Sequence, residues 1–152
     1  MKNSLPGTDV FIRGLSAISP QNTWDSTTFL PEIIHHKDSL SCVLPDFNAF
    51  IPPMQLRRLS RMARMGITCA KICLQDGHAA NVDAIITATG YGFQEDMARF
   101  LTEILEQKEQ QLSPTYFVQS GYNAMAGMLA MALDCSGYNN NFVSRCLAFE
   151  TS

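Results

Sequence analysis

The chain has 152 residues, of which 46% are hydrophobic and 16% charged, and its net charge is -3. This length fits one domain, and so few charges favour a globular protein with an apolar surface or a large interface. The negative charge argues against a nucleic-acid binder, which needs clustered Lys and Arg. No apolar run approaches the ~20 residues that span a bilayer, and residues 1–7 lack a signal-peptide core. We therefore expect a cytoplasmic protein.

Strands and helices alternate along the sequence. β-Branched and aromatic residues in alternation predict a first strand over residues 9–18. Five prolines then punctuate a loop-rich stretch over residues 19–53. An apolar stripe at helical period predicts one long helix over residues 54–76, which Gly77 is well placed to end.

The second half continues the alternation. A nearly continuous apolar run over residues 83–89 is typical of a strand buried on both faces. Residues 94–111 form a predicted amphipathic helix, closed by a breaker at Ser113 and Pro114. A Met- and Ala-rich helix is expected from residue 121 or 123 to 134, and a last strand over residues 138–144.

This order of elements predicts an α/β fold with a mainly parallel sheet and right-handed crossovers. Residues 124–133 are apolar on every side of their predicted helix, so they need cover all round. We expect that cover from a missing part of a larger fold or from a substantial partner.

The cysteines do not suggest a disulfide framework, because there are five of them at irregular spacing. Cys69 and Cys73 lie four residues apart on a predicted helix and are typical of small buried hydrophobic residues. A metal site is the alternative for this pair, but His35, His36 and His78 add no matching ligand spacing. We expect no bound metal.

Five motifs stand in the order and spacing of one enzyme family. They are Phe11-Ile-Arg-Gly14 with Ser19-Pro20, the arginine run over residues 57–66, the strand and glycine turn over residues 83–92, Ser113-Pro-Thr-Tyr-Phe-Val-Gln-Ser120, and Gly137-Tyr-Asn-Asn. From about residue 9 onward the chain resembles the N-terminal half of a β-ketoacyl synthase. It is most similar to the ketosynthase-like proteins of aryl polyene and flexirubin pigment clusters.

The resemblance implies the N-terminal half of a thiolase-like fold, with a mixed, mainly parallel sheet and helices on both faces. It divides the chain into a flexible N-terminus, residues 1–8, and a ketosynthase-like domain, residues 9–152, that lacks the C-terminal half. No cofactor is implied, because Claisen condensation of carrier-bound thioesters needs none.

Cys146 matches the family's nucleophile, which carries the growing acyl chain. Such a thiol is activated at a helix N-terminus, beside backbone amides that form an oxyanion hole. Here Arg145 precedes it and the large apolar Leu147 and Phe149 follow. The family's two activating histidines belong to its C-terminal half. A buried structural cysteine is therefore favoured over a nucleophile.

Other positions of the family pattern are small or polar. Gly90 and Gly92 match a glycine turn after a core strand, where backbone segments approach closely. Asn123 matches a residue that starts a helix, which an N-cap role explains. Gly127 and Gly137 complete this set of tunnel or structural positions. For the arginine run a solvated helix face is favoured over docking of an acyl carrier protein.

Three hypotheses for function remain open. The first is a non-catalytic subunit that pairs with a complete ketosynthase and shapes its acyl tunnel, as chain-length factors do. The second is an acyltransferase that uses Cys146. The third is a truncated portion of a longer enzyme, because only six residues follow Cys146.

The resemblance also implies an interface. In thiolase-fold dimers the strand before the nucleophile turn pairs across the two-fold axis, and here that strand includes Tyr138, Phe142 and Val143. It carries no charge and no proline to protect an exposed edge. We expect a homodimer, or a heterodimer with a complete ketosynthase.

Overall fold

The computed structural model describes residues 9–25 and 32–151. The expected flexible N-terminus, residues 1–8, lies outside the described residues. The α/β class and the parallel sheet are confirmed: β1 (Ala84–Thr89) and β2 (Tyr138–Val143) pair in parallel, with Ala84 opposite Tyr138 and Thr89 opposite Val143. Both strands lie where the sequence predicts them, although β1 is not buried on both faces, since Ile86 is 54% exposed.

The predicted long helix is divided in two. Its parts are α1 (Pro53–Leu56) and α2 (Arg61–Asp76), and residues 57–60 break the helix between them. The break occurs because Ser60 is extended and its hydroxyl accepts the backbone N–H of Ala63, which caps α2. Gly77 ends α2 as predicted, with its N–H bonded to the carbonyl of Cys73.

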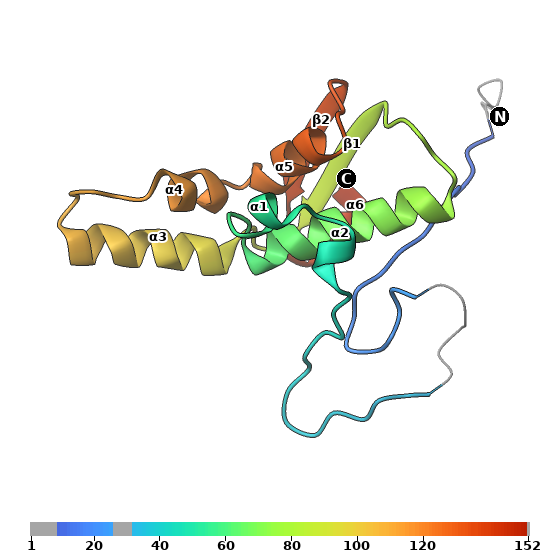
Figure 1. The fold of residues 1–152 in the computed structure, drawn as a ribbon, viewed down its shortest axis with the longest axis horizontal. Helices are drawn as coiled ribbons and strands as arrows, with labels where there is room; N and C mark the ends of the chain where they lie inside the picture. Colours follow the sequence, from blue (N-terminus) through green and yellow to red (C-terminus); the bar gives the residue numbers. More distant parts are fainter. Residues whose placement is uncertain (1–8, 26–31, 152) are drawn as a thin grey trace, which may run out of the picture.

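Two further helices form a projecting arm. α3 (Gln94–Gln107) ends a turn earlier than predicted, at a left-handed Lys108. α4 (Pro114–Ser120) is not among the predicted helices, because Pro114 signals the end of one helix, whereas proline also suits the first turn of the next. Figure 1 shows α3 and α4 side by side, extending away from the sheet.

The core lies where α2, α5 (Ala124–Ala132) and β1 meet. Its two buried clusters are Ile51 with Ile67, Ile85 and Leu129, and Ala63 with Phe93 and Ala124. α5 contacts both strands and α2. It is not buried all round as predicted, because Met131 is 86% exposed and a Cβ on Gly127 would meet nothing within 4 Å. The described residues leave one side of α5 uncovered.

The predicted first strand is wrong. Residues 9–18 form no strand, and Val10, Phe11 and Ile12 are 80% to 95% exposed. A strand needs a partner ladder, whereas residues 13–16 are held instead by the C-terminal half of α2. Figure 1 shows this segment passing the end of α2, away from the sheet. Across the described residues, no helix is long and apolar enough to cross a membrane.

Candidate functional site

Cys146 lies just beyond the carboxyl end of the sheet, in the short 3-10 turn η2 (Arg145–Leu147) that leads into α6 (Ala148–Thr151). The turn is fixed to the end of β1, because the N–H of Arg145 donates to the carbonyl of Gly90 at 3.0 Å. A Cβ on Gly90 would lie 3.1 Å from the carbonyl oxygen of Arg145, so the two backbones are closely packed.

The residue before the cysteine is conformationally unusual. Arg145 has a φ of 47°, a left-handed value that is uncommon for a long side chain. Cys146 itself is exposed, which contradicts the expected buried cysteine. The predicted burial of Cys146 is wrong because all three residues of η2 are exposed. The first buried residue of this segment is Ala148, two positions after Cys146.

In the part of the chain that the structure describes, no side chain forms a hydrogen bond with the thiol of Cys146. No histidine there hydrogen-bonds to Cys146: the ring of His36 contacts the carbonyl of Pro20, and His78 follows the far end of α2. A reactive thiol needs a neighbouring base or cation, or a helix N-terminus.

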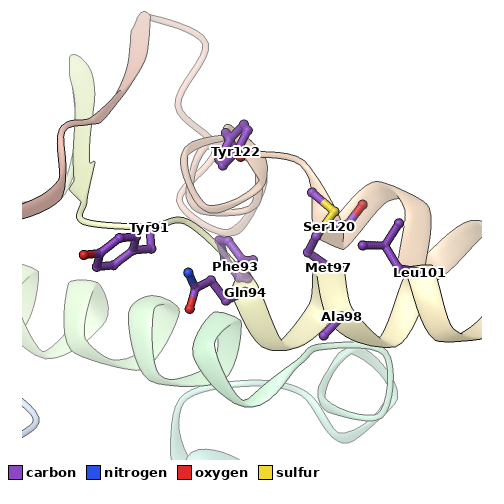
Figure 2. Close-up of a pocket in the computed structure, with 8 residues that line it drawn as sticks. All are labelled: Tyr91, Phe93, Gln94, Met97, Ala98, Leu101, Ser120 and Tyr122. Atoms are coloured by element: carbon purple, nitrogen blue, oxygen red, sulfur yellow. The ribbon is translucent and has the colours of Figure 1, made fainter.

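An apolar hollow of about 420 Å³ lies beside the Gly90–Gly92 turn, and Tyr91 of this turn lines it. Figure 2 shows its lining side chains, which come from the β1–α3 connection, the first eight residues of α3, the end of α4 and the connection between α4 and α5. They carry no formal charge and are Tyr91, Phe93, Gln94, Met97, Ala98, Leu101, Ser120 and Tyr122.

Gly92 sets the position of one wall of the hollow. Its φ of 71° lies in the left-handed region, and a Cβ there would stand 2.7 Å from the ring of Tyr122. The tyrosine therefore packs directly on the glycine. Sequence reasoning found Gly92 but missed Tyr122, since nothing in the local pattern shows that residues thirty positions apart touch.

The remaining motif residues lie around β2 and α5. Asn123 stands at the N-cap position of α5, but its side chain makes no capping hydrogen bond. Gly137 passes so close to the start of β1 that a Cβ would lie 1.8 Å from the carbonyl oxygen of Asp83. Of the expected interface residues, Tyr138 is 61% and Val143 41% exposed, while Phe142 is half-buried.

A second, basic cleft of about 330 Å³ brings the arginine run against the α3–α4 arm. Arg57, Arg58 and Arg64 line it together with Arg99 of α3. Two contacts hold the cleft: Arg64 Nε donates to the carbonyl of Leu59 at 2.9 Å, and the buried side-chain amide of Gln119 donates to the carbonyl of Arg58. Arg99 is already paired with Glu95 Oε1 at 2.6 Å, so Arg57, Arg58 and Arg64 are the guanidinium groups that the cleft offers to an anionic group.

Asp96 also lines this cleft, and the sequence analysis does not identify it. Its residue is only 3% exposed. Burial raises the pKa of the Asp96 carboxyl, while a hydrogen bond from Ser60 and the charge of Arg99 act in the opposite direction. The signal was present in the sequence, because Asp96 lies at i+3 from Phe93 and i−4 from Phe100, on the apolar side of its helix.

The raised pKa of Asp96 predicts a pH dependence of stability. The folded protein binds this proton more tightly than the unfolded chain, so stability falls as pH rises above the ordinary Asp pKa towards the raised value. Asp96→Asn removes the ionisation and keeps an acceptor for Ser60. We expect the free energy of unfolding of this variant, measured in urea, to increase relative to that of the wild type as the pH rises from acid to neutral.

The exposed Glu106→Gln in the same helix is the control for losing one surface carboxylate. An Asp96→Asn variant that is less stable than the wild type by the same amount at every pH would instead make the carboxylate a structural acceptor alone.

The fold, a parallel sheet with packed helices, matches a fragment of a thiolase-like ketosynthase fold. The chain belongs to the β-ketoacyl synthase family, since residues 32–138 match the family described as "Beta-ketoacyl synthase, N-terminal domain". The matched region ends before Cys146, so the role of that residue stays a prediction. No match was found among curated proteins.

Two solved structures are similar to the chain. The first is a ketosynthase (ApeO) in complex with its chain length factor (ApeC) from Xenorhabdus doucetiae, with 24% identity and a TM-score of 0.62. The match covers 88% of this chain and 54% of that one. The second is a β-ketoacyl synthase from Burkholderia phymatum STM815, with 14% identity and a TM-score of 0.51, covering 92% and 35%. The chain thus spans about half or less of the length of these structures.

Proposed function

We propose that this chain is a non-catalytic, ketosynthase-like subunit of polyketide or fatty-acid-type chain extension, and that it pairs with a complete ketosynthase as a chain-length factor does. The observation that carries the proposal is the turn at Cys146, where an exposed thiol follows a left-handed Arg145 and is flanked by the large apolar Leu147 and Phe149. By the resemblance of its motifs, the pathway is aryl polyene or flexirubin pigment synthesis.

The hollow beside the Gly90–Gly92 turn supports this role. An acyl chain requires apolar walls, and the lining of the hollow is aromatic and aliphatic without a formal charge. Tyr91 and Tyr122 are 61% and 58% exposed, so the hollow is open and a second chain can complete it. In the proposed assembly these side chains form part of the tunnel wall that limits product length.

Two observations support the proposed partner. The similar structure from Xenorhabdus doucetiae is a ketosynthase in complex with its chain length factor. In this chain, α5 and β2 leave apolar side chains uncovered in the described residues. An acidic acyl carrier protein is a further partner, for which the arginine cleft supplies the complementary charge.

A second candidate function is acyl transfer through an acyl-thioester on Cys146. It is favoured by one observation: the thiol is exposed at the carboxyl end of the two parallel strands, where α/β enzymes place their reacting groups. Its activating groups would then come from another chain, or from residues beyond this sequence.

Reconstitution with a complete ketosynthase from the same gene neighbourhood distinguishes the two functions. We expect the Cys146→Ala variant to support product formation at the wild-type rate, because the partner supplies the nucleophile. We also expect iodoacetamide to label Cys146 no faster than an ordinary free cysteine. Cys42→Ala is the control substitution.

A loss of about 100-fold or more in product formation on Cys146→Ala would establish the second candidate, because removing a nucleophile costs at least this much. A stable acyl adduct on Cys146, or selective labelling of Cys146 over Cys135, would lead to the same conclusion.

A further inference from the structure

Residues 13–16, called the strap below, are seated on α2 through two thiols. Cys73 Sγ donates to the carbonyl of Gly14 at 3.3 Å, and Cys69 Sγ donates to the hydroxyl of Ser16 at the same distance. The two cysteines are one helical turn apart, so both thiols face the strap. This explains the Cys69–Cys73 spacing, which the proposed function does not use.

Two polar contacts hold the same segment at the end of α2. The N–H of Leu15 donates to Asp76 Oδ2 at 2.9 Å, and Arg13 Nη2 donates to the carbonyl of His78 at 3.2 Å. All four contacts are exposed or half-buried and none is an ion pair between charged side chains. Hydrogen bonds of this kind contribute only about 1 kcal/mol each, so the strap is releasable without unfolding the core.

The strap and the helix end are packed too closely to admit added atoms. A Cβ on Gly14 would lie 2.4 Å from the carbonyl oxygen of Cys73 and 2.6 Å from the backbone nitrogen of Gly77. A Cβ on Gly77 would lie 3.2 Å from the carbonyl oxygen of Arg13. A substituent of several heavy atoms on Cys73 Sγ would therefore displace Gly14.

We infer that the strap is a thiol-controlled latch, closed when Cys73 is a free thiol and held open when Cys73 carries a mixed disulfide with a small-molecule disulfide. In that step the Cys73 thiolate attacks one sulfur of the small disulfide. A new S–S bond forms to Cys73, the original S–S bond breaks, and the departing thiolate takes up a proton. One disulfide and one thiol are present before and after the exchange.

The closed latch protects its own thiol. Burial raises the pKa of Cys73, and the neighbouring Cys69 and Asp76 act in the same direction, so the reactive thiolate is disfavoured while the strap is seated. Exchange proceeds through the open state, and the adduct then prevents closing. Opening frees the exposed apolar residues 10–12 that precede the strap and lets them move to another surface.

Limited trypsin digestion of the full chain tests the latch, because the bond after Arg13 lies inside it. We expect the Cys73 adduct formed with glutathione disulfide, identified by mass analysis, to be cut after Arg13 about tenfold faster than the untreated protein. The Cys73→Ser variant, treated in the same way, should show no such increase. Equal cleavage rates for modified and unmodified protein would overturn the inference.

Gly14→Ala provides the reverse test, since its Cβ opens the strap without any modification. We expect about tenfold faster reaction of Cys73 with glutathione disulfide in this variant, as for a locally unfolded segment. Gly127→Ala is the matched control, because a Cβ there meets nothing within 4 Å. An unchanged rate in Gly14→Ala would show that the strap does not guard the thiol.

Discussion

Replacing Gly137 by alanine is expected to destabilise the protein by about 3 kcal/mol, the upper range for forcing atoms into a packed site. The added Cβ would stand 1.8 Å from the carbonyl oxygen of Asp83 and 2.9 Å from its carbonyl carbon. Both obstacles are backbone atoms, so no side chain can rotate away to make room.

The sheet cannot relax around this clash without losing its register. Gly137 and Asp83 immediately precede the first pair of the ladder, Tyr138 with Ala84. Moving either backbone by more than an ångström would break the start of a sheet that has only two described strands. Loss of that pairing also removes support from α5, which packs on both strands.

Gly127→Ala in α5 is the matched control for Gly137→Ala. A Cβ at Gly127 meets nothing within 4 Å, so the helix gains up to about 1 kcal/mol from the better helix former. Urea unfolding at constant pH should therefore move the two midpoints in opposite directions. A Gly137→Ala protein as stable as the wild type would show that the two strand entries are not tightly packed.

The fold class could be predicted because the two strands are strongly patterned and well separated. The run over residues 83–89 has β-branched residues between turn signals, and residues 138–144 follow a glycine. The helix between them is too apolar for a loop. Parallel pairing follows from such a crossover, so the sequence alone supports the sheet.

The helix boundaries were less predictable, because two local preferences compete there. The apolar period continues through residues 57–60, yet Ser60 stabilises α2 more as an N-cap than as an interior residue. Pro114 interrupts one helix and favours the first turn of another. Periodicity cannot decide either case, since it does not report backbone hydrogen bonds.

The prediction of a first strand was wrong for a different reason. The alternation over residues 9–18 predicts a strand, but alternation does not select a partner strand. The strap is fixed on α2 by Cys69, Cys73 and Asp76, some sixty residues away in the sequence. Contacts of such separation leave no mark on the local pattern.

The same distinction between local pattern and contacts made only on folding applies to the candidate sites. The glycines and Cys146 were found because the resemblance supplies them one by one. The hollow at Tyr122 and the cleft at Asp96 combine side chains from elements that meet only after folding. Only Asp96 gave a local signal, as a carboxylate on an apolar helix face.

β2 and α5 together form an uncovered surface. In the described residues β2 pairs on one edge only, and its sequence has neither charge nor proline to discourage pairing on the other. Val143 at its end and Met131 on α5 are 41% and 86% exposed. We predict that this surface pairs with a second copy when the chain is alone, and with a complete ketosynthase when one is present.

The Val143→Lys variant is expected to weaken binding to a complete ketosynthase about 100-fold, since desolvating an unpaired ammonium within an interface costs several kcal/mol. Val143 is the better target than Phe142, because its side chain is exposed in the single chain and the substitution spares the fold. Size-exclusion chromatography with mass analysis measures the shift from dimer to monomer.

Leu40→Lys, at a loop residue that is 75% exposed, is the matched control and should bind as the wild type does. A wild-type chain that stays monomeric and folded at high micromolar concentration, with or without the ketosynthase, would show that this surface is not an interface.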